Sequence, residues 1–270
     1  MKTFFVDSFT KEPFKGNPAG VCFPGYAISE DRMLQIAHEF GLSETAFVQN
    51  TNKPDTYGIR YFSPKKEIPL CGHATLAAAK IIFKLPAFDE IHFITVKNLD
   101  LRIKRQGEEI LMELPIYDTL AAIAPPAMLK ALGLSEIIHT AYNQESKIIL
   151  LEIADSDILA GLAPDFNALL HSHESIHGVL VTAPSNNRDY DYQYRYFWPW
   201  AGTNEDPVTG GVQTFLAKYW SERLNKRIMK AFQPSKRTGY INIELQKDKV
   251  LLSSQAVIIL EGELNIPDSF

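Results

Sequence analysis

Residues 60–64 read RYFSP and residues 195–199 read RYFWP, so one five-residue phrase occurs twice, about half a chain length apart. At equal distances after the two prolines, each copy continues into a glycine-containing turn and a helix-like segment, at 73–85 and at 209–224. Taken alone, the repeated five-residue phrase could also arise by coincidence. The matched order of phrase, turn and helix favours a duplicated fold, because a repeated structural unit leaves this kind of periodic signal.

A second pair of segments extends the match. LRIKRQGEEILM (101–112) and INIELQKDKVLL (241–252) carry apolar residues at matching alternate positions around polar turns, which predicts a hairpin in each half. Because strands and helices do not alternate as βαβ units, the predicted fold class is α+β with two similar domains. Further strands are indicated by apolar or alternating runs at 45–49, 92–96, 148–154, 178–183, 190–197 and 250–260.

Local signals place two more helices. Ser29 is a favoured N-cap ahead of the amphipathic segment 31–40, and Gly41 can close that helix in the left-handed conformation. Pro125 and Pro126 are expected to start another helix, which ends near Gly133.

The stretch 116–126 is poor in charge and marked by prolines, which is typical of a connection between domains. We therefore expect an N-terminal domain over 1–116 and a C-terminal domain over 117–270. The last residues, from about 259 to 270, are expected to pack back onto the N-terminal domain.

The charge balance limits the possible partners. A formal net charge of −5 and a pI near 5.8 lack the basic surplus that binds phosphate groups, so neither nucleic acid nor a membrane surface is expected. A small-molecule ligand is expected instead. Cys22 and Cys71 are too few for a disulfide framework, and no segment is apolar and long enough for export or for a membrane span. We expect a cytoplasmic protein.

The two expected helix starts are candidate anion sites, because a helix N-terminus exposes unpaired N–H groups and a partial positive charge. The first start reads Cys71-Gly72-His73, and the second runs from Asp206 to Gly211. His73 and Asp206 would add a group that titrates near neutral pH and a fixed negative charge. The structural alternative makes Asp206 an N-cap with Pro207 at the first helical position, and assigns the glycines to close packing.

Glu44 lies after the helix-closing Gly41 and directly before an apolar strand. A carboxylate at such a junction is either a solvated loop residue or, if it points into a cleft, a proton shuttle whose pKa is raised by partial desolvation. Sequence spacing leaves both alternatives open.

Long motifs in this order resemble the PhzF-like phenazine biosynthesis family, within the diaminopimelate epimerase-like fold. The resemblance implies two pseudosymmetric halves, each a curled, mostly antiparallel sheet around a central helix, with the active site between them. It also implies a homodimer. The motifs are DSFTKEPFKGNPAGVC (7–22), GLSETAFV (41–48), IRYFSPKKEIPLCGHATLAAA (59–79), GVLVTAP (178–184), RYFWPWAGTNEDPVTGG (195–211) and VLLSSQAVIILEGEL (250–264).

The best-known members of this family isomerise trans-2,3-dihydro-3-hydroxyanthranilate without a cofactor or a metal. By resemblance, Glu44 would move a proton between ring carbons of a small carboxylic acid, with His73 and Asp206 as further catalytic groups. The positions implied to contact the substrate are Asn17, Ser43, Gly72, Gly210 and Gly211.

Two departures qualify the resemblance. Racemases of this fold use two cysteines, but only Cys71 stands at the first position, with Asp206 aligned at the second. Cys22 lies in an early strand and is no replacement, so we expect Cys71 to be a small packing residue. The sequence Gly211-Val212-Gln213 replaces the Ser-Ala-His of many members, which leaves the phenazine substrate open. Arg237 is a candidate anion contact or a surface-turn residue.

Two other functions remain as alternatives. His173, Glu174 and His177 form a literal H-E-x-x-H, which on a helix would bind zinc, but Gly178 and a strand follow at once. The second alternative is a binding or scaffold protein that keeps the fold and has lost catalysis.

Overall fold

The computed structural model describes residues 1–84 and 87–266. The chain divides into two compact units: unit 1 comprises residues 1–113 together with the chain from 252 onward, and unit 2 comprises residues 114–251. From the sequence, these two divisions are expected at 116/117 and at about 259. Residues 267–270 of the expected returning segment lie outside the described residues.

Unit 1 is a curled sheet around one helix. Its neighbouring strands pair antiparallel for β1–β2, parallel for β2–β3, antiparallel for β3–β4, parallel for β4–β6 and antiparallel for β6–β7 and β7–β8. The elements are β1 (Lys2–Ser8), β2 (Asn17–Phe23), α1 (Glu30–Phe40), β3 (Glu44–Asn50), β4 (Thr56–Phe62), β5 (Glu67–Ile68), α2 (Gly72–Ile82), β6 (Glu90–Thr95), β7 (Asp100–Gln106), β8 (Glu109–Pro115) and β18 (Ala256–Glu263).

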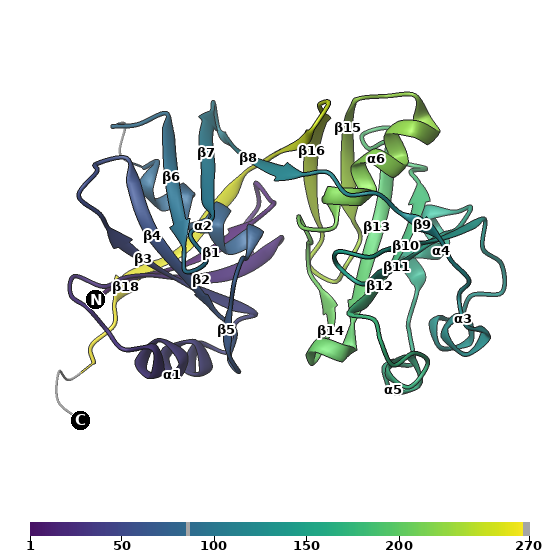
Figure 1. Ribbon diagram of the computed structural model, residues 1–270, viewed down its shortest axis with the longest axis horizontal. Coiled ribbons are helices and arrows are strands. Elements are labelled where there is room, and N and C mark those ends of the chain that lie inside the picture. The colour runs from purple at the N-terminus through teal and green to yellow at the C-terminus, as the bar shows by residue number, and fades with distance from the viewer. Residues whose placement is uncertain (85–86, 267–270) are drawn as a thin grey trace. The chain divides into compact units, whose positions relative to one another are not determined.

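Helix α2 is the central helix of unit 1, and Figure 1 shows it among the strands of that unit. Every residue of α2 except Gly72 and Lys80 is buried. A helix that is apolar on all sides belongs inside a core, which explains the alanine-rich sequence that follows His73. The predicted segment reached Leu85, which lies outside the described residues.

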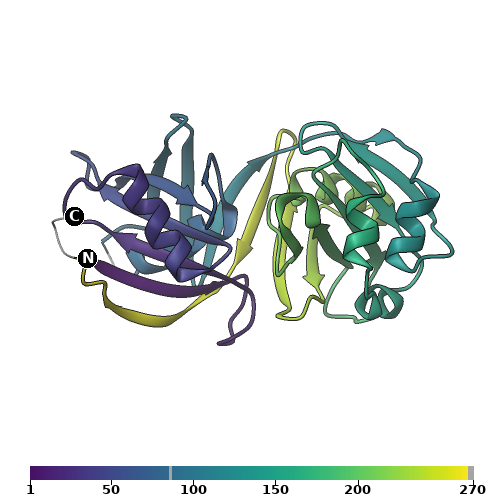
Figure 2. The same ribbon diagram turned by 90° about the horizontal axis from the view of Figure 1, so that it is seen from below.

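Strand β18 returns the chain to unit 1. It pairs antiparallel with β1, from Ser8 opposite Ala256 to Lys2 opposite Glu263, with one irregularity in register. Figure 2 shows the yellow β18 beside the purple β1. Because pairing with β1 begins at Ala256, the returning segment starts earlier than the expected residue of about 259.

Unit 2 repeats the order of strand pairing seen in unit 1. The pairs are β10–β11 antiparallel, β11–β12 parallel, β12–β13 antiparallel, β13–β15 parallel and β15–β16 antiparallel. The duplicated α+β fold is therefore confirmed by topology. The elements are β9 (Leu120–Ala121), α3 (Pro126–Leu132), β10 (His139–Asn143), β11 (Ile148–Glu152), α4 (Ser156–Gly161), α5 (Phe166–Leu170), β12 (Gly178–Pro184), β13 (Tyr192–Trp198), η1 (Pro199–Ala201), β14 (Thr203–Asp206), α6 (Gln213–Leu224), β15 (Ile228–Gln233) and β16 (Gly239–Leu245). Strand β17 (Lys249–Ser254) begins in unit 2 and ends in unit 1.

The repeated phrase places an arginine at the same position in each sheet. Arg60 on β4 makes two hydrogen bonds of 2.7 Å to Glu67, and Arg195 on β13 makes two of 2.7 and 2.8 Å to Glu205. Each guanidinium also lies over the phenylalanine of its own phrase. The phrase is therefore a structural device, in which an arginine fixes the short strand that follows.

Helix ends follow the predicted capping for α1 and α3. The Ser29 side chain accepts from the Arg32 N–H, and Gly41 closes α1 at φ +60° with its N–H bonded to the Ala37 carbonyl. Gly133 ends α3 in the same left-handed conformation, at φ +72°. These signals were readable because capping depends only on neighbours in the sequence.

Three sequence-based expectations differ from the structure. The expected strand at 250–260 is two strands, β17 and β18, separated by Gln255, whose carbonyl accepts from the Thr10 N–H. The second central helix begins at Gln213, well after the expected segment opens at 209. The stretch 116–126 belongs to unit 2, because β9 pairs with β10 and the Tyr117 N–H binds the Thr214 carbonyl.

Among the residues described, no helix is both long enough and apolar enough to cross a membrane.

Candidate active site

Glu44 is the first residue of β3, and the backbone reaches it directly from the left-handed turn at Gly41. Strand β3 lies between β2 and β4, with Ala19 of β2 as the parallel partner of Glu44. Only 6% of Glu44 is exposed, so the solvated-loop alternative is wrong. A carboxyl group at the inner end of a central strand is held by the fold rather than by a mobile loop.

His73 faces this carboxylate from the start of α2. Its Nε2 lies 3.2 Å from Glu44 Oε2, and its Nδ1 lies 3.4 Å from the Sγ of Cys71, the N-cap residue. The Ser8 hydroxyl donates to the His73 carbonyl at 2.7 Å, which fixes the first turn of the helix against β1. Two elements that are distant in sequence thus bring a carboxylate, an imidazole and a thiol together.

Ser43 and Asn17 lie beside Glu44 and His73 in unit 1. The Ser43 Oγ lies 3.3 Å from His73 Nε2 and donates to Asn17 Oδ1 at 3.4 Å. Asn17 is fully buried at the start of β2. A Cβ at Gly72 would meet no atom within 4 Å, so packing does not require glycine at the first position of α2.

Burial sets the protonation of this group. The His73 pKa falls to about 3, because desolvation penalises the imidazolium. Desolvation raises the pKa of Glu44, opposed by hydrogen bonds from Ser43 and Cys71. The 3.2 Å contact has the geometry of an ion pair, but a neutral imidazole is the form that burial favours. We therefore treat the pair as a neutral histidine sharing a hydrogen bond with a carboxyl group.

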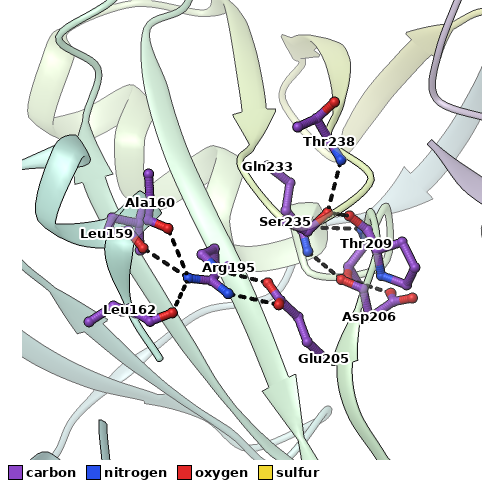
Figure 3. Close-up of polar contacts among 11 residues, drawn as sticks. Leu159, Ala160, Leu162, Arg195, Glu205, Asp206, Thr209, Gln233, Ser235 and Thr238 are labelled. Atoms are coloured by element: carbon purple, nitrogen blue, oxygen red, sulfur yellow. Dashed lines mark hydrogen bonds and ion pairs between the residues drawn. The ribbon is translucent and has the colours of Figure 1, made fainter. Parts of the chain in front are cut away.

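In unit 2, Asp206 is the last residue of β14 and is 7% exposed. Thr209 Oγ1 donates to its carboxylate at 2.5 Å, and Gln233 Nε2 donates to its backbone carbonyl at 2.5 Å (Figure 3). The N-cap of α6 is Val212. The alternative that made Asp206 an N-cap, with Pro207 at the first helical position, is therefore wrong.

Two residues that the sequence analysis did not single out hold the loop after Asp206. Gln233 is fully buried and also accepts from the Thr209 N–H at 3.0 Å, while the Ser235 hydroxyl donates to the Pro207 carbonyl at 2.5 Å. Both lie in the stretch 232–240, in which the sequence indicated only Arg237 as a candidate contact. Their partners are distant in sequence, so no local signal marks them.

Strand register corrects the alignment between the halves. Asp206 pairs with Tyr196 of the second phrase, and Ile68 pairs with Tyr61 of the first. The counterpart of Asp206 is thus Ile68 and not Cys71, because the connection from Phe197 to Glu205, which contains η1, is longer than the connection from Phe62 to Glu67. By the same register Glu44 corresponds to Gly178, where an added Cβ would lie 2.5 Å from the Tyr196 ring. Only unit 1 has room for an acid at this position.

The structure places the expected site residues in two groups, each described within its own unit. Unit 1 holds Asn17, Ser43, Glu44, Gly72 and His73. Unit 2 holds Asp206, Gly210 and Gly211, and the two glycines lie in the turn that leads into α6. A Cβ at Gly211 would also meet no atom within 4 Å, so close packing does not account for that glycine.

The H-E-x-x-H sequence does not form a metal site of the helical type. Residues 173–177 are bend and coil rather than helix. The Ser175 N–H binds His173 Nδ1, and His177 Nδ1 lies 3.1 Å from the Ser146 carbonyl. Within residues 1–84 and 87–266, the one group of His, Cys, Asp or Glu side chains with metal-ligand spacing is Glu44, Cys71 and His73.

A duplicated, mostly antiparallel α+β fold is shared with proteins of the racemase and epimerase class. The solved structure of a protein described as a probable proline racemase, from Agrobacterium radiobacter, matches with a TM-score of 0.61 at 9% identity. It covers 98% of this chain and 93% of that one, which shows a common fold.

The family follows from closer relatives. The family model described as phenazine biosynthesis-like protein matches residues 6–262, and the chain belongs to this PhzC-PhzF family. An uncharacterized isomerase of Halalkalibacterium halodurans is 38% identical over 97% of both chains. A PhzF family structure from Enterococcus faecalis matches at 32% identity with a TM-score of 0.89, over 98% of this chain and 99% of that one. The comparisons support an isomerase at the level of the family.

Proposed function

We propose that this protein is a cofactor-independent isomerase that moves a proton on a small unsaturated or cyclic carboxylic acid, with Glu44 as the general acid/base. The observation that carries the proposal is the buried contact of 3.2 Å between Glu44 Oε2 and His73 Nε2. Removing a proton from carbon requires a base close to that carbon and a way to hold the charge that develops. Glu44 would take the proton and return it at a second carbon.

The surroundings of Glu44 suit this role. Desolvation raises the pKa of its carboxyl group, which strengthens the carboxylate as a base and also allows the protonated form to act as an acid. His73, kept neutral by burial, can donate or accept a hydrogen bond without adding a charge. Its proposed part is to orient the carboxyl group and a polar substituent of the substrate.

The carboxylate of the substrate is assigned to backbone N–H groups. The N-cap of α2, Cys71, makes no side-chain capping bond, and Gly72 leaves open space beside the first turn. Such a helix start favours a bound anion. Asn17 and Ser43 would contact the substrate from β2 and from the turn before β3. This reaction type needs neither a metal nor a nucleotide.

Asp206, Gly210 and Gly211 are proposed as the contribution of unit 2 to substrate binding and catalysis. The bonds from Thr209 and Gln233 hold Asp206 as a fixed, buried carboxylate, which suits an amino or hydroxyl substituent. The reaction would be similar to the isomerisation of trans-2,3-dihydro-3-hydroxyanthranilate. A cytoplasmic homodimer, expected from the sequence, stays a prediction.

Solvent-deuterium exchange tests the proposal. A panel of small unsaturated carboxylic acids is incubated in D₂O with the wild type, and incorporation is read by mass spectrometry. Glu44→Gln should lower exchange into a true substrate at least about a hundredfold, because the transferred proton has no carrier. Glu39→Gln, which changes an exposed carboxylate on α1, is the matched control and should exchange normally.

Two outcomes would overturn the assignment. Undiminished exchange in Glu44→Gln removes Glu44 from the acid/base role. Tight binding of an acid by the wild type without any exchange favours the alternative of a binding protein that has lost catalysis.

A further inference from the structure

The thiol of Cys71 lies beside Glu44 and His73, and the proposed isomerisation does not use this thiol. Cys71 was expected to be a packing residue, yet its Sγ lies 3.4 Å from Nδ1 and 3.9 Å from Nε2 of His73. One donor atom from each of Glu44, Cys71 and His73 lies within 4.8 Å of the others, and all three residues are buried. A carboxylate, a thiol and an imidazole at this spacing are the donors that zinc prefers.

The separations match a zinc coordination shell. With metal–ligand distances of about 2.1 Å to nitrogen and oxygen and about 2.3 Å to sulfur, tetrahedral ligands lie about 3.4 Å (N···O) and about 3.6 Å (N···S) apart. The separations here are 3.2 Å from His73 Nε2 to Glu44 Oε2 and 3.9 Å from Nε2 to Cys71 Sγ. Both separations from His73 Nε2 thus lie within a few tenths of an ångström of the tetrahedral values, and the third, between Glu44 and Cys71, is within 4.8 Å. A fourth position is left for water or a ligand oxygen.

The backbone around these donors is already fixed. The Cys71 carbonyl accepts from both the side chain and the N–H of Thr75, at 2.7 and 3.0 Å. The His73 carbonyl accepts from Ser8, and Glu44 starts a central strand. Held ligands lose little conformational freedom on binding an ion, which favours affinity. A thiolate and a carboxylate would also balance the charge of a divalent ion, so the loaded site would be neutral in its buried setting.

We propose that Glu44, Cys71 and His73 bind Zn²⁺, and that the bound ion switches off the proton transfer assigned to Glu44. On binding, the Cys71 thiol loses its proton to solvent, and its sulfur and the Glu44 carboxylate each donate an electron pair to the metal. A coordinated carboxylate no longer serves as a proton carrier. The switching half of this inference rests on the proposed function, while the binding half is independent of it.

Binding is measured first, without any substrate. Protein produced without a histidine tag is stripped with EDTA, and added Zn²⁺ is titrated in competition with a chromogenic chelator. We expect one ion per chain, with affinity at least about a hundredfold weaker in Cys71→Ala, because one of three ligands is lost. Co²⁺ in place of Zn²⁺ should give a thiolate-to-metal charge-transfer band in the wild type and none in Cys71→Ala.

His173→Ala is the matched control, because it disrupts the H-E-x-x-H sequence and leaves Cys71 intact. It should bind Zn²⁺ like the wild type. Absence of a stoichiometric ion, or Zn²⁺ that is retained in Cys71→Ala and lost in His173→Ala, would overturn the site. Circular dichroism of each variant separates loss of ligand from loss of fold, and Cys71→Ser gives a second variant of near-native size.

The switching half is then tested in the exchange assay. One equivalent of Zn²⁺ should suppress exchange in the wild type, EDTA should restore it, and Cys71→Ala should be insensitive. Exchange that rises with Zn²⁺ would contradict the inhibitory role. If no acid exchanges with the metal-free protein, the proposed function fails, while the competition titration and the Co²⁺ spectrum still decide whether the site exists.

Discussion

Ser43 tunes the carboxyl group that it neighbours. Its hydroxyl lies between Asn17 and His73, and hydrogen bonding from Ser43 lowers the pKa of Glu44 against the larger raising effect of desolvation. Removing the hydroxyl in Ser43→Ala should therefore raise the Glu44 pKa further. Because the proposed mechanism needs the ionised Glu44 carboxylate as a base in the free protein, the acid limb of kcat/KM should move to higher pH.

The measurement is the pH profile of exchange between pH 4 and 9, with EDTA present. His73 should contribute no ionisation there, because its pKa of about 3 lies below the range. An acid limb that stays in place in Ser43→Ala would show that another group controls the profile. A structural role of Ser43 alone would lower the rate without moving the limb.

At the scale of elements, the two copies of the arginine phrase differ in burial. The Arg195 side chain is 9% exposed and also donates to the carbonyls of Leu159, Ala160 and Leu162 (Figure 3), whereas the Arg60 side chain is 26% exposed. Arg195→Met should cost about 3–5 kcal/mol of unfolding free energy, because Glu205 and three carbonyls lose their donor. Arg60→Met should cost about 1 kcal/mol, since water can replace its contacts.

Urea unfolding of the two variants, followed by circular dichroism, measures this difference. Each variant is the matched control for the other, because the same substitution is made at equivalent positions of the two copies. Equal costs would contradict the argument from burial.

Elements were predictable where the signal was local, and the site was predictable only in part. Ser29, Gly41 and Gly133 marked helix ends correctly because capping involves adjacent residues. Counting from the repeated prolines aligned Cys71 with Asp206, and this was wrong because the connection from β13 to β14 holds extra residues that the connection from β4 to β5 lacks. Gln233 at the end of β15 forms hydrogen bonds with Asp206 and Thr209, which lie at the end of β14 and in the loop after it. Sequence spacing does not predict these hydrogen bonds, because the partners are far apart in the chain.

For the whole molecule, the chain order makes the two units unequal. Unit 2 is one continuous segment, 114–251, whereas unit 1 needs residues from both ends of the chain. Strand β18 pairs with the whole length of β1, so residues 1–113 alone leave an unpaired edge and an uncovered core. We expect residues 1–113 alone to remain unfolded and residues 114–251 to fold.

A fused chain tests this dependence on β18. The Ser253 hydroxyl donates to Glu109 at 2.5 Å, so the cut end at 252 lies near the start of β8, the strand that also carries the cut end at 113. A Gly-Ser linker long enough to run back along β8 can join residues 1–113 to residues 252–266, because the loop-closure entropy grows only slowly with linker length. The fused chain should unfold cooperatively in urea, and residues 1–113 alone should show no transition. Because Glu44, Cys71 and His73 all belong to unit 1, the folded fused chain should also bind one Zn²⁺. A cooperative transition in residues 1–113 alone would show that unit 1 folds without β18 and would contradict the prediction.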